Sequence, residues 1–447
     1  MQAEQAKPRR AWGPPIAGAV IAVTALGLDT LSSITHALPV HWIPVLGVSA
    51  GLILACWPPA LRLLLRRERK HRWRTGALAL LPPAALAGYA LWTPALICTV
   101  PSPPMAFLSG GLRHLAYEIR IRHYGFRDLH LTEARVLGED GSLLRTFDAD
   151  WLVNGPFRGE EGRQQSITLP AGRDATLFLW LALRQDEPLP DRLGHVLVLA
   201  ASGQDEAMPA LGPSTYRRRR PRLPVIQSPL SGGPWLARAG PSNWSRHRRA
   251  RVLGHISQRF AIDWVRIDRE GSLLRQPTAD GQDAANTDYL SYAAQVRSAF
   301  SGVVAEVRDG WPDNPPGKLL QPSNLSNFAG NYVAVRHDLG FCAFYGHLKQ
   351  DSVAVRAGEK IFAGRLLGQI GNSGNSDDPH LHFQVADDCD PLISEGLPYH
   401  FEGYLSHGYL PWEREGGFSL PAGQAVEYGL PLHNEIVTFP PREDAVR

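Results

Sequence analysis

Short strand-like runs separated by glycines fill residues 242–385, and they limit the folds open to this part of the chain. The runs are 248–253, 258–267, 302–307, 332–336, 341–345, 360–362 and 380–385. The punctuating glycines are Gly302, Gly330, Gly340, Gly358, Gly364, Gly368 and Gly371. Glycine supplies the backbone conformations that tight turns need, and no long helical period interrupts the series. The pattern predicts a compact β-rich domain.

A His-x-His pair lies inside this region. His380 and His382 follow a segment, 372–379, that is rich in Asn, Ser, Gly and Asp and is therefore typical of a turn. On a strand, residues two apart face the same side at a separation of about 7 Å, so the two imidazoles would project together. Neutral imidazoles are good zinc ligands. The alternative is an ordinary strand with two exposed histidines, and the surrounding motifs have to decide between them.

The cysteines add little. None of the four belongs to a C-x-x-C motif, which argues against a thiolate zinc finger. A bridge between Cys342 and Cys389 could form in an oxidising compartment, but the spacing alone does not favour it.

Three long apolar stretches set the first hundred residues apart. They cover residues 14–38, 43–65 and 76–98, each near the roughly 20 residues that a helix needs to cross a bilayer. Basic residues precede the first stretch and, at 66–74, separate the second from the third. The positive-inside rule assigns both basic segments to the cytoplasm. We therefore expect residues 1–100 to form three transmembrane helices in a bacterial cytoplasmic (inner) membrane, with the lipid bilayer as partner and the later residues in the periplasm or cell-wall space.

Alternation of apolar and polar residues follows this segment. It is clear at 117–122 and at 177–181, with turn-forming clusters between the runs. Several short strands at such spacing predict an immunoglobulin-like β-sandwich over residues 106–205. This region holds no acid–base constellation, so we expect a structural or binding module.

Residues 206–241 are rich in Pro, Gly and Arg and are expected to form an extended linker. Their arginine run, 217–222, is typical of a solvated surface, with contact to anionic lipid or wall polymer as the alternative. The whole chain has 46 basic and 43 acidic residues, so its formal charge of +3 identifies no partner. No nucleic-acid partner is expected, because the predicted topology places the linker outside the cytoplasm.

An ordered series of motifs in the C-terminal region resembles the zinc metallopeptidases of the LytM/lysostaphin type, peptidase family M23. The motifs are 301–304, 330–337, 345–348, 355–360, 368–374 and 379–383. The resemblance implies a β-rich LytM-like domain within residues 242–447, which include a C-terminal extension. It also implies a zinc ion held by an H-x-x-x-D motif and by the second histidine of H-x-H.

Carried over residue by residue, the resemblance implies that Asp263 and His382 bind zinc and that His347 and His380 are catalytic. One ligand of the family pattern is missing. Arg259 stands four residues before Asp263, and it cannot ligate zinc because it stays protonated.

A histidine from elsewhere could replace the missing ligand. On one straight strand His255 would lie about 27 Å from Asp263, at about 3.4 Å per residue. If 248–253 and 256–263 pair as a hairpin, His247 lies opposite Ile262 or Asp263, about 5–8 Å away. We therefore expect His247 to complete the site, with His255 or no third histidine as the alternatives.

These residues predict a mainly β, membrane-anchored zinc endopeptidase that hydrolyses peptide bonds in the stem peptides of peptidoglycan. Zinc would lower the pKa of a bound water, His380 would accept its proton, and His347 would stabilise the oxyanion and protonate the leaving amine. Two alternatives stay open. One is a degenerate zinc-free domain that binds and activates a partner cell-wall hydrolase, which would make that regulatory protein its partner. The other is a general periplasmic metalloprotease.

Overall fold

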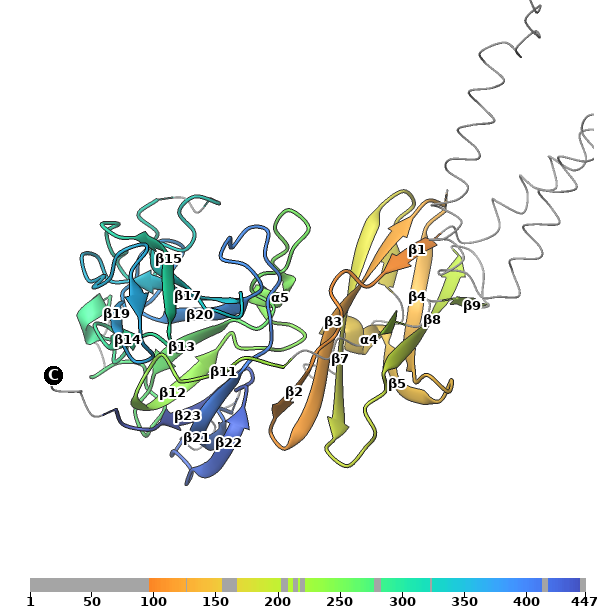
Figure 1. Cartoon of the computed structure of the whole chain (residues 1–447). Coiled ribbons are helices and arrows are strands. Elements are labelled where there is room, and N and C mark those ends of the chain that lie inside the picture. Colours follow the sequence, from red (N-terminus) through yellow and green to blue (C-terminus); the bar gives the residue numbers. More distant parts are fainter. Residues whose placement is uncertain are drawn as a thin grey trace, which may run out of the picture. The chain divides into compact units, whose positions relative to one another are not determined.

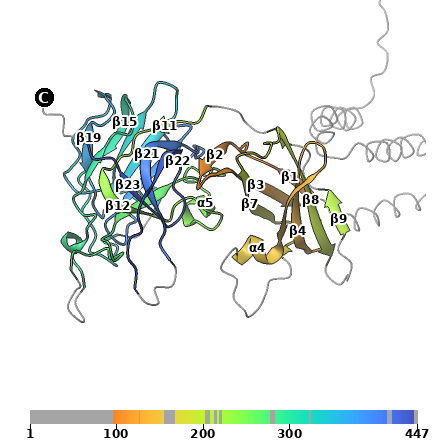
Figure 2. The same ribbon diagram turned by 90° about the horizontal axis from the view of Figure 1, so that it is seen from below.

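The computed structural model describes residues 96–125, 127–154, 167–201, 208–211, 216–217, 222–276, 283–321, 324–411 and 417–442. The chain divides into two compact units (Figures 1 and 2). The first comprises residues 1–101, 118–177 and 190–217, and the second comprises residues 102–117, 178–189 and 218–447.

The residues between 96 and 217 form two sheets and one short helix. Their elements are β1 (Leu96–Thr99), β2 (Ala106–Ser109), β3 (Leu112–His123), β4 (Leu129–Leu137), β5 (Leu143–Asp148), α4 (Ala149–Asn154), β6 (Ile167–Leu169), β7 (Asp174–Arg184), β8 (Arg192–Ala201), β9 (Met208–Leu211) and β10 (Tyr216–Arg217). One sheet has the order β1-β3-β2, with β7 paired to β3. The other has the order β10-β8-β4-β5, with β6 paired to β4 and β9 to β8. The immunoglobulin-like assignment and the boundaries 106–205 remain predictions.

Burial in these sheets follows the alternation of the sequence. In β4 the side chains of Leu129, Leu131, Ala134 and Val136 are buried, and the residues between them are more exposed. Because successive side chains of a strand point to opposite faces, this pattern gives the sheet one apolar face.

A larger sheet dominates the second unit (Figure 1). The elements of this region are β11 (Val225–Ile226), β12 (Gly232–Arg238), α5 (Arg246–Arg249), β13 (Ile262–Arg266), η2 (Asn286–Asp288), β14 (Gln295–Arg297), β15 (Gly302–Arg308), β16 (Asn331–Arg336), β17 (Cys342–Leu348), β18 (Lys360–Ile361), β19 (Leu366–Gln369), β20 (Leu381–Ala386), β21 (His400–Tyr409), β22 (Gln424–Gly429) and β23 (Glu435–Phe439). The strand order is β11-β21-β23-β12-β13-β20-β17-β16-β15-β18, with β22 paired to β21. Strands β14 and β19 form a separate pair.

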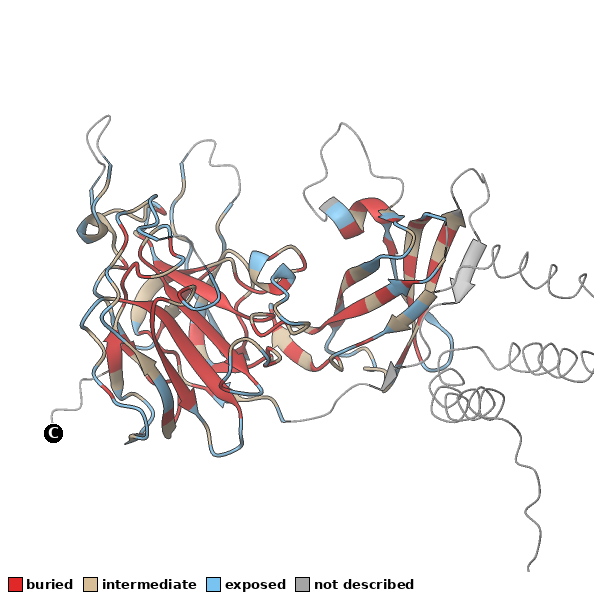
Figure 3. Cartoon of the chain, turned by 90° about the horizontal axis from the view of Figure 1, so that it is seen from above, coloured by how far each residue is buried: buried red, intermediate tan, exposed pale blue. Residues whose placement is uncertain are grey.

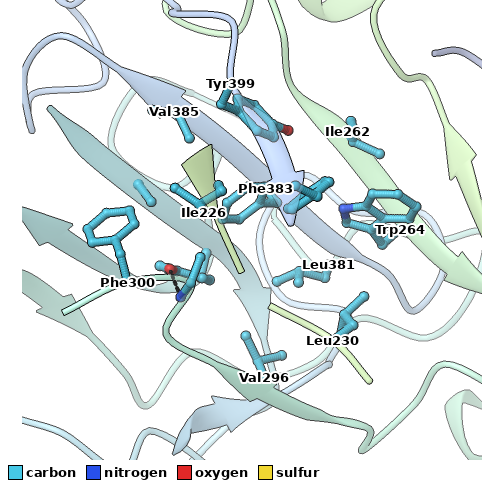
Figure 4. Close-up of a cluster of buried hydrophobic side chains, with 14 of the residues drawn as sticks. Ile226, Leu230, Ile262, Trp264, Val296, Phe300, Leu381, Phe383, Val385 and Tyr399 are labelled. Atoms are coloured by element: carbon cyan, nitrogen blue, oxygen red, sulfur yellow. Dashed lines mark hydrogen bonds between the residues drawn. The ribbon is translucent and has the colours of Figure 1, made fainter. Parts of the chain in front are cut away.

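The central strands of the large sheet are buried along their length, as Figure 3 shows. Aromatic side chains pack on one face of it, and Figure 4 shows several of them together with Ile226, Val296 and Leu381. Trp264 of β13 lies 5.3 Å from Phe439 of β23, ring centroid to ring centroid, and Phe383 of β20 lies 5.5 Å from Tyr399. Since side chains alternate along a strand, the residues next to Trp264 and Phe383 face the other side of the sheet.

The predicted transmembrane anchor has to be corrected. Over the described residues the helices are α4, α5 and the single 3₁₀ turn η2, and none is long and apolar enough to cross a bilayer. The end of the third predicted span is a strand instead, because β1 pairs with β3 through Leu96 opposite His123. The remainder of the stretches 14–38, 43–65 and 76–98 lies outside the described residues.

Within the described residues the fold is mainly β and no membrane-spanning helix is found, so the multi-pass inner-membrane location and the bilayer partner are not supported. The prediction rested on the length of apolar runs, and length alone does not distinguish a membrane span from apolar residues that pair as a strand, as those of β1 do.

Candidate metal centre

Three adjacent central strands bring the predicted site residues together. In the register of β13 and β20, Asp263 stands opposite His382. In the register of β17 and β20, Gly346 stands opposite the same histidine, which places His347 at the neighbouring position. His380 directly precedes β20. The site therefore lies across β13, β20 and β17, on the face opposite Trp264 and Phe383.

Three side chains form a compact group of donor atoms. His247, Asp263 and His382 each offer one ligand atom, and these atoms lie within 4.8 Å of one another. His247 Nε2 lies 3.3 Å from Asp263 Oδ2, and His382 Nδ1 lies 3.0 Å from Asp263 Oδ1. All three side chains are largely buried, with 11–13% of each exposed.

His247 reaches the site from a helix and not from the expected hairpin. It lies in the short helix α5, and the only pairing within 248–261 among the described residues is an isolated bridge between Val252 and His255. The helix is fixed by Arg248, whose fully buried guanidinium donates hydrogen bonds to the carbonyl oxygens of Tyr117 and Leu179. The hairpin prediction was wrong because this buried arginine, and not cross-strand pairing, sets the path of the chain.

The outer nitrogens of the two histidines support a metal between the inner ones. His247 Nδ1 donates to Ala239 O at 3.0 Å, and His382 Nε2 donates to Gln384 Oε1 at 2.9 Å. Each ring thereby presents its inner nitrogen to the carboxylate of Asp263. Burial would lower the pKa of His247, but the charge of Asp263 and its hydrogen bond outweigh burial and raise that pKa. Two imidazole nitrogens and a carboxylate that share a buried space can bind a cation, and oxygen acceptors on the far ring nitrogens are typical of zinc-bound histidines. The residues present fit a zinc ion.

His380 and His347 lie beside this group. His380 Nε2 lies 3.6 Å from Asp263 Oδ1, while its Nδ1 donates to Asp378 O at 2.8 Å. His347 Nδ1 donates to Ser373 O at 2.8 Å, and its ring centroid lies 4.7 Å from that of His380. Within the described residues neither Nε2 makes a hydrogen bond, although that of His380 faces Asp263, so both nitrogens are available to a substrate.

The backbone at His347 is unusual. Its φ is +58°, in the left-handed region that few residues other than glycine adopt. Its amide donates to Ala329 O at 3.0 Å, which helps to hold this conformation. Strained backbone of this kind concentrates at functional sites.

Burial and neighbouring charges shift the pKa values of the side chains in the site. Burial and the neighbouring His380 and His382 lower the pKa of His347 well below its usual range. Burial also lowers the pKa of His380, although Asp263 opposes this effect. Burial would raise the pKa of Asp263, but the charges of His247 and His380 outweigh it and hold that pKa well below the usual range. The site thus combines a carboxylate and two histidines, His347 and His380, whose pKa values are all lowered, a pattern that serves acid–base chemistry.

Arg259 and His255 are both engaged away from the donor group. Arg259 is 3% exposed and donates to Glu395 Oε2 at 2.6 Å and to Gly396 O. His255 Nδ1 lies 3.0 Å from Glu395 Oε1. The arginine at the family's missing ligand position is thus the partner of a carboxylate, and of the two candidate histidines it is His247 that joins the group.

Three residues around the site, Arg238, Asp378 and Gln384, escaped the sequence analysis. Arg238 of β12 stands opposite Asp263 in register and forms a two-point ion pair with Asp378, with contacts of 2.7 and 2.5 Å. Asp378 in turn supplies the carbonyl that holds His380. Gln384 could have been found, because it lies two residues after His382 and so on the same face, whereas Arg238 depends on the distant pairing of β12 with β13.

Residues 283–393 match the family model for peptidase family M23. His347, His380 and His382 fall inside the matched residues, and the strands that carry them have the geometry described above. This part of the chain is an M23-family domain.

Curated relatives match parts of the chain. Peptidoglycan DD-endopeptidase ShyC of Vibrio cholerae is 33% identical over 140 residues, which are 31% of this chain and 28% of ShyC. Endolysin 2638A of Staphylococcus phage 2638A is 30% identical over 101 residues, 22% of this chain and 20% of the endolysin. The matches therefore span less than a third of either relative.

Among solved structures, the catalytic domain of lysostaphin from Staphylococcus simulans is 22% identical and aligns with 28% of this chain and 86% of that domain, at a TM-score of 0.18. A score this low adds no support, so we base the family of the M23 domain on the sequence matches.

Proposed function

We propose that the M23 domain is a zinc-dependent endopeptidase that hydrolyses peptide bonds of peptidoglycan. The group formed by His247, Asp263 and His382 carries this proposal, since it offers three ligand atoms to one ion, the number of protein ligands typical of a catalytic zinc site. The substrate class is supported by relatives that include the peptidoglycan DD-endopeptidases ShyC and ShyA of Vibrio cholerae.

In this proposal His247, Asp263 and His382 hold zinc, which would supply a water of lowered pKa and polarise the peptide carbonyl. His380 accepts a proton at Nε2, because its Nδ1–H is committed to the carbonyl of Asp378. The Arg238–Asp378 pair fixes the direction of that ring by holding the residue that supplies the carbonyl.

His347 acts on the other side of the reacting carbonyl in this scheme. Its Nδ1–H is bound to Ser373 O, so its neutral ring offers only an acceptor at Nε2. The proton that His380 takes from the water passes to this nitrogen, from which the ring donates to the developing oxyanion and then protonates the leaving amine. The closeness of His347 and His380 suits such an exchange of roles.

The regions 106–205 and 242–447 are retained as the proposed sandwich and peptidase regions. The expected linker 206–241 has to be shortened, because β11 and β12 belong to the large sheet. A zinc-free binding domain receives no support from Arg259, because its pairing with Glu395 accounts for an arginine at that position while His247 stands beside Asp263.

The test uses the full chain purified with its metal. We expect about one zinc per chain, release of new amino groups from purified sacculi, no cleavage of casein, and loss of activity on chelation that added zinc restores. His407, which lies in β21 outside the donor group, provides the control variant His407→Ala. A chain with full zinc that cleaves casein and leaves sacculi intact would contradict the substrate class, and an active chain without zinc would contradict the metal role.

A further inference from the structure

The second unit contains a cavity that none of the five proposed site residues lines. Its volume is about 840 Å³, within the range of ligand sites in proteins. Residues 227–230 form one wall, β18 and the turn that follows it form another, and the end of β23 with residues 440–442 closes it.

Positive charge gathers in this cavity. Arg297, Lys360, Arg365 and Arg442 line it, together with the two carboxylates Glu359 and Glu402. Arg365 lies 3.5 Å from Glu359, so these two charges offset each other. Three cations then face the single carboxylate of Glu402, which leaves the cavity electropositive.

Arg442 is the cation most in need of a partner. Its Nη2 donates to the carbonyl of Ser228, while its Nη1 is buried without a hydrogen-bond partner. Within the described residues neither Arg442 nor Lys360 has an ion pair at 4.0 Å or less. Burial and the charge of Arg297, which lines the same cavity, lower the pKa of Arg442, while Tyr345 and Glu402 partly offset this effect. A pair of like charges in a partly enclosed space favours a bound anion.

The rest of the lining points to more than a simple ion. Leu230, Ile361 and Phe439 are buried apolar residues of the wall, and Leu230 lies in the core cluster of Figure 4. Phe362 is 83% exposed at the same site. Apolar walls with a few placed charges are typical of sites for small organic ligands. A ligand that has a carboxylate, an apolar portion and an amine for Glu402 matches this lining, and a short acidic peptide has all three.

We propose that this cavity is a second, non-catalytic binding site for a short acidic peptide, whose carboxylate is held by Arg442, Arg297 and Lys360. The binding itself is independent of the proposed hydrolase activity. If the activity is also as proposed, the site would hold a further stretch of peptide belonging to the same wall polymer while the metal centre acts elsewhere on it.

The experiment is a calorimetric titration of the full-length chain with the dipeptide alanyl-glutamate, its uncharged diamide and inorganic phosphate. We expect the dipeptide to bind more tightly than phosphate, and the diamide not to bind. The variants Arg442→Gln and Lys360→Gln should each weaken dipeptide binding about tenfold or more, since each removes a charge-assisted hydrogen bond. Arg356→Gln, which removes an exposed arginine outside the cavity, should leave binding unchanged.

Lys360 is exposed, so its variant tests the site even if Arg442→Gln folds poorly. A chain that ends at Arg442 should bind as the full chain does, which excludes an effect of the acidic residues Glu443 and Asp444. Equal affinity of Lys360→Gln and Arg356→Gln, or phosphate binding as tight as that of the dipeptide, would overturn the proposal. Zinc content and sacculus cleavage should be unaltered in Lys360→Gln, so the two proposals fail or stand separately.

Discussion

Arg259 and Glu395 form an ion pair at 2.6 Å, with 4% of the arginine side chain and 20% of the glutamate side chain exposed. The arginine stands four residues before Asp263, where the resemblance to M23 peptidases implies a metal ligand. Here it holds the loop after β20 against the segment that leads into β13, and Glu395 also binds His255. The arginine has a structural role, and in our proposal the ligand comes from α5 instead.

Replacing Arg259 by Met should destabilise the M23 domain without removing its metal. We expect a loss of about 3 kcal/mol in the free energy of unfolding, because Glu395 loses the partner that compensates its largely buried charge. Urea unfolding and metal analysis measure the two effects. The double variant Arg259→Met/Glu395→Leu should recover much of the stability, and loss of zinc from Arg259→Met at unchanged stability would contradict this role.

His247→Ala should abolish stoichiometric zinc binding, because it leaves two ligands of the proposed three. His255→Ala is the matched control, since this histidine contacts Glu395 and not the donor group. Metal analysis after dialysis against a weak chelator distinguishes them. Full zinc in His247→Ala together with an empty His255→Ala would reverse the assignment.

His380→Ala and His347→Ala should each bind zinc and yet lose activity on sacculi by about 10²- to 10⁴-fold, the usual contribution of a general acid or base. Their ring nitrogens at Nδ1 are bound to backbone carbonyls, so neither is needed to assemble the three-ligand group. Zinc content and cleavage rate are measured on the same preparation. Activity within a few-fold of wild type in either variant would remove that residue from the mechanism.

The Cys342–Cys389 disulfide closes a loop with a sequence separation of 47 residues. Loop-closure entropy for that length corresponds to a stabilisation of about 4 kcal/mol. The double variant Cys342→Ser/Cys389→Ser should lose stability by up to this amount in urea unfolding, and a reducing agent should shift the wild-type midpoint but not that of the variant. A Cys98→Ser variant is the control, because Cys98 is a free cysteine.

His400 should make the second unit sensitive to acid. It is 9% exposed, and its Nε2 accepts a hydrogen bond from the amide of Leu108 at 2.8 Å, so it is neutral when folded. Burial lowers the pKa of His400 from 6.5 to about 4. The unfolded chain therefore binds the extra proton between these values, and stability that is present above pH 6.5 is lost as the pH falls toward 4, by up to about 3 kcal/mol.

The variant His400→Gln keeps an oxygen acceptor for the Leu108 amide and does not titrate. Unfolding free energy measured between pH 4 and 7 should fall less steeply in this variant than in wild type. Identical slopes would show that another group causes the acid sensitivity.

Local sequence patterns predicted strands of the M23 domain, whereas contacts between residues far apart in the sequence could not be predicted. The run 380–385 and strand β20 nearly coincide, because the alternation and flanking turn residues that define a strand lie within a few positions. The position of His247 could not be predicted from local patterns in this way. It depends on Arg248, which inserts between Asn243 and the carbonyls of Tyr117 and Leu179, more than 65 residues away in sequence. No pattern near residue 247 signals that contact, so a simple hairpin was the natural but wrong expectation.

The apolar N-terminal region shows a second limit. A hydropathy window counts apolar residues and takes no account of pairing between strands. The predicted span 76–98 therefore ran into β1, whose backbone pairs with β3. Arg238 was missed for a similar reason, because its place beside Asp263 is fixed by the register of β12 and β13 and not by its neighbours in sequence.

The pairing of Asp263 with His382 across β13 and β20 means that ion binding and strand alignment cannot be separated. A slip of one residue between these strands would turn one partner toward the aromatic core and leave the other alone. An ion that requires both would then select the native alignment from the slipped ones and hold the middle of the sheet in place, so removal of zinc should loosen β13 and β20 before the outer strands.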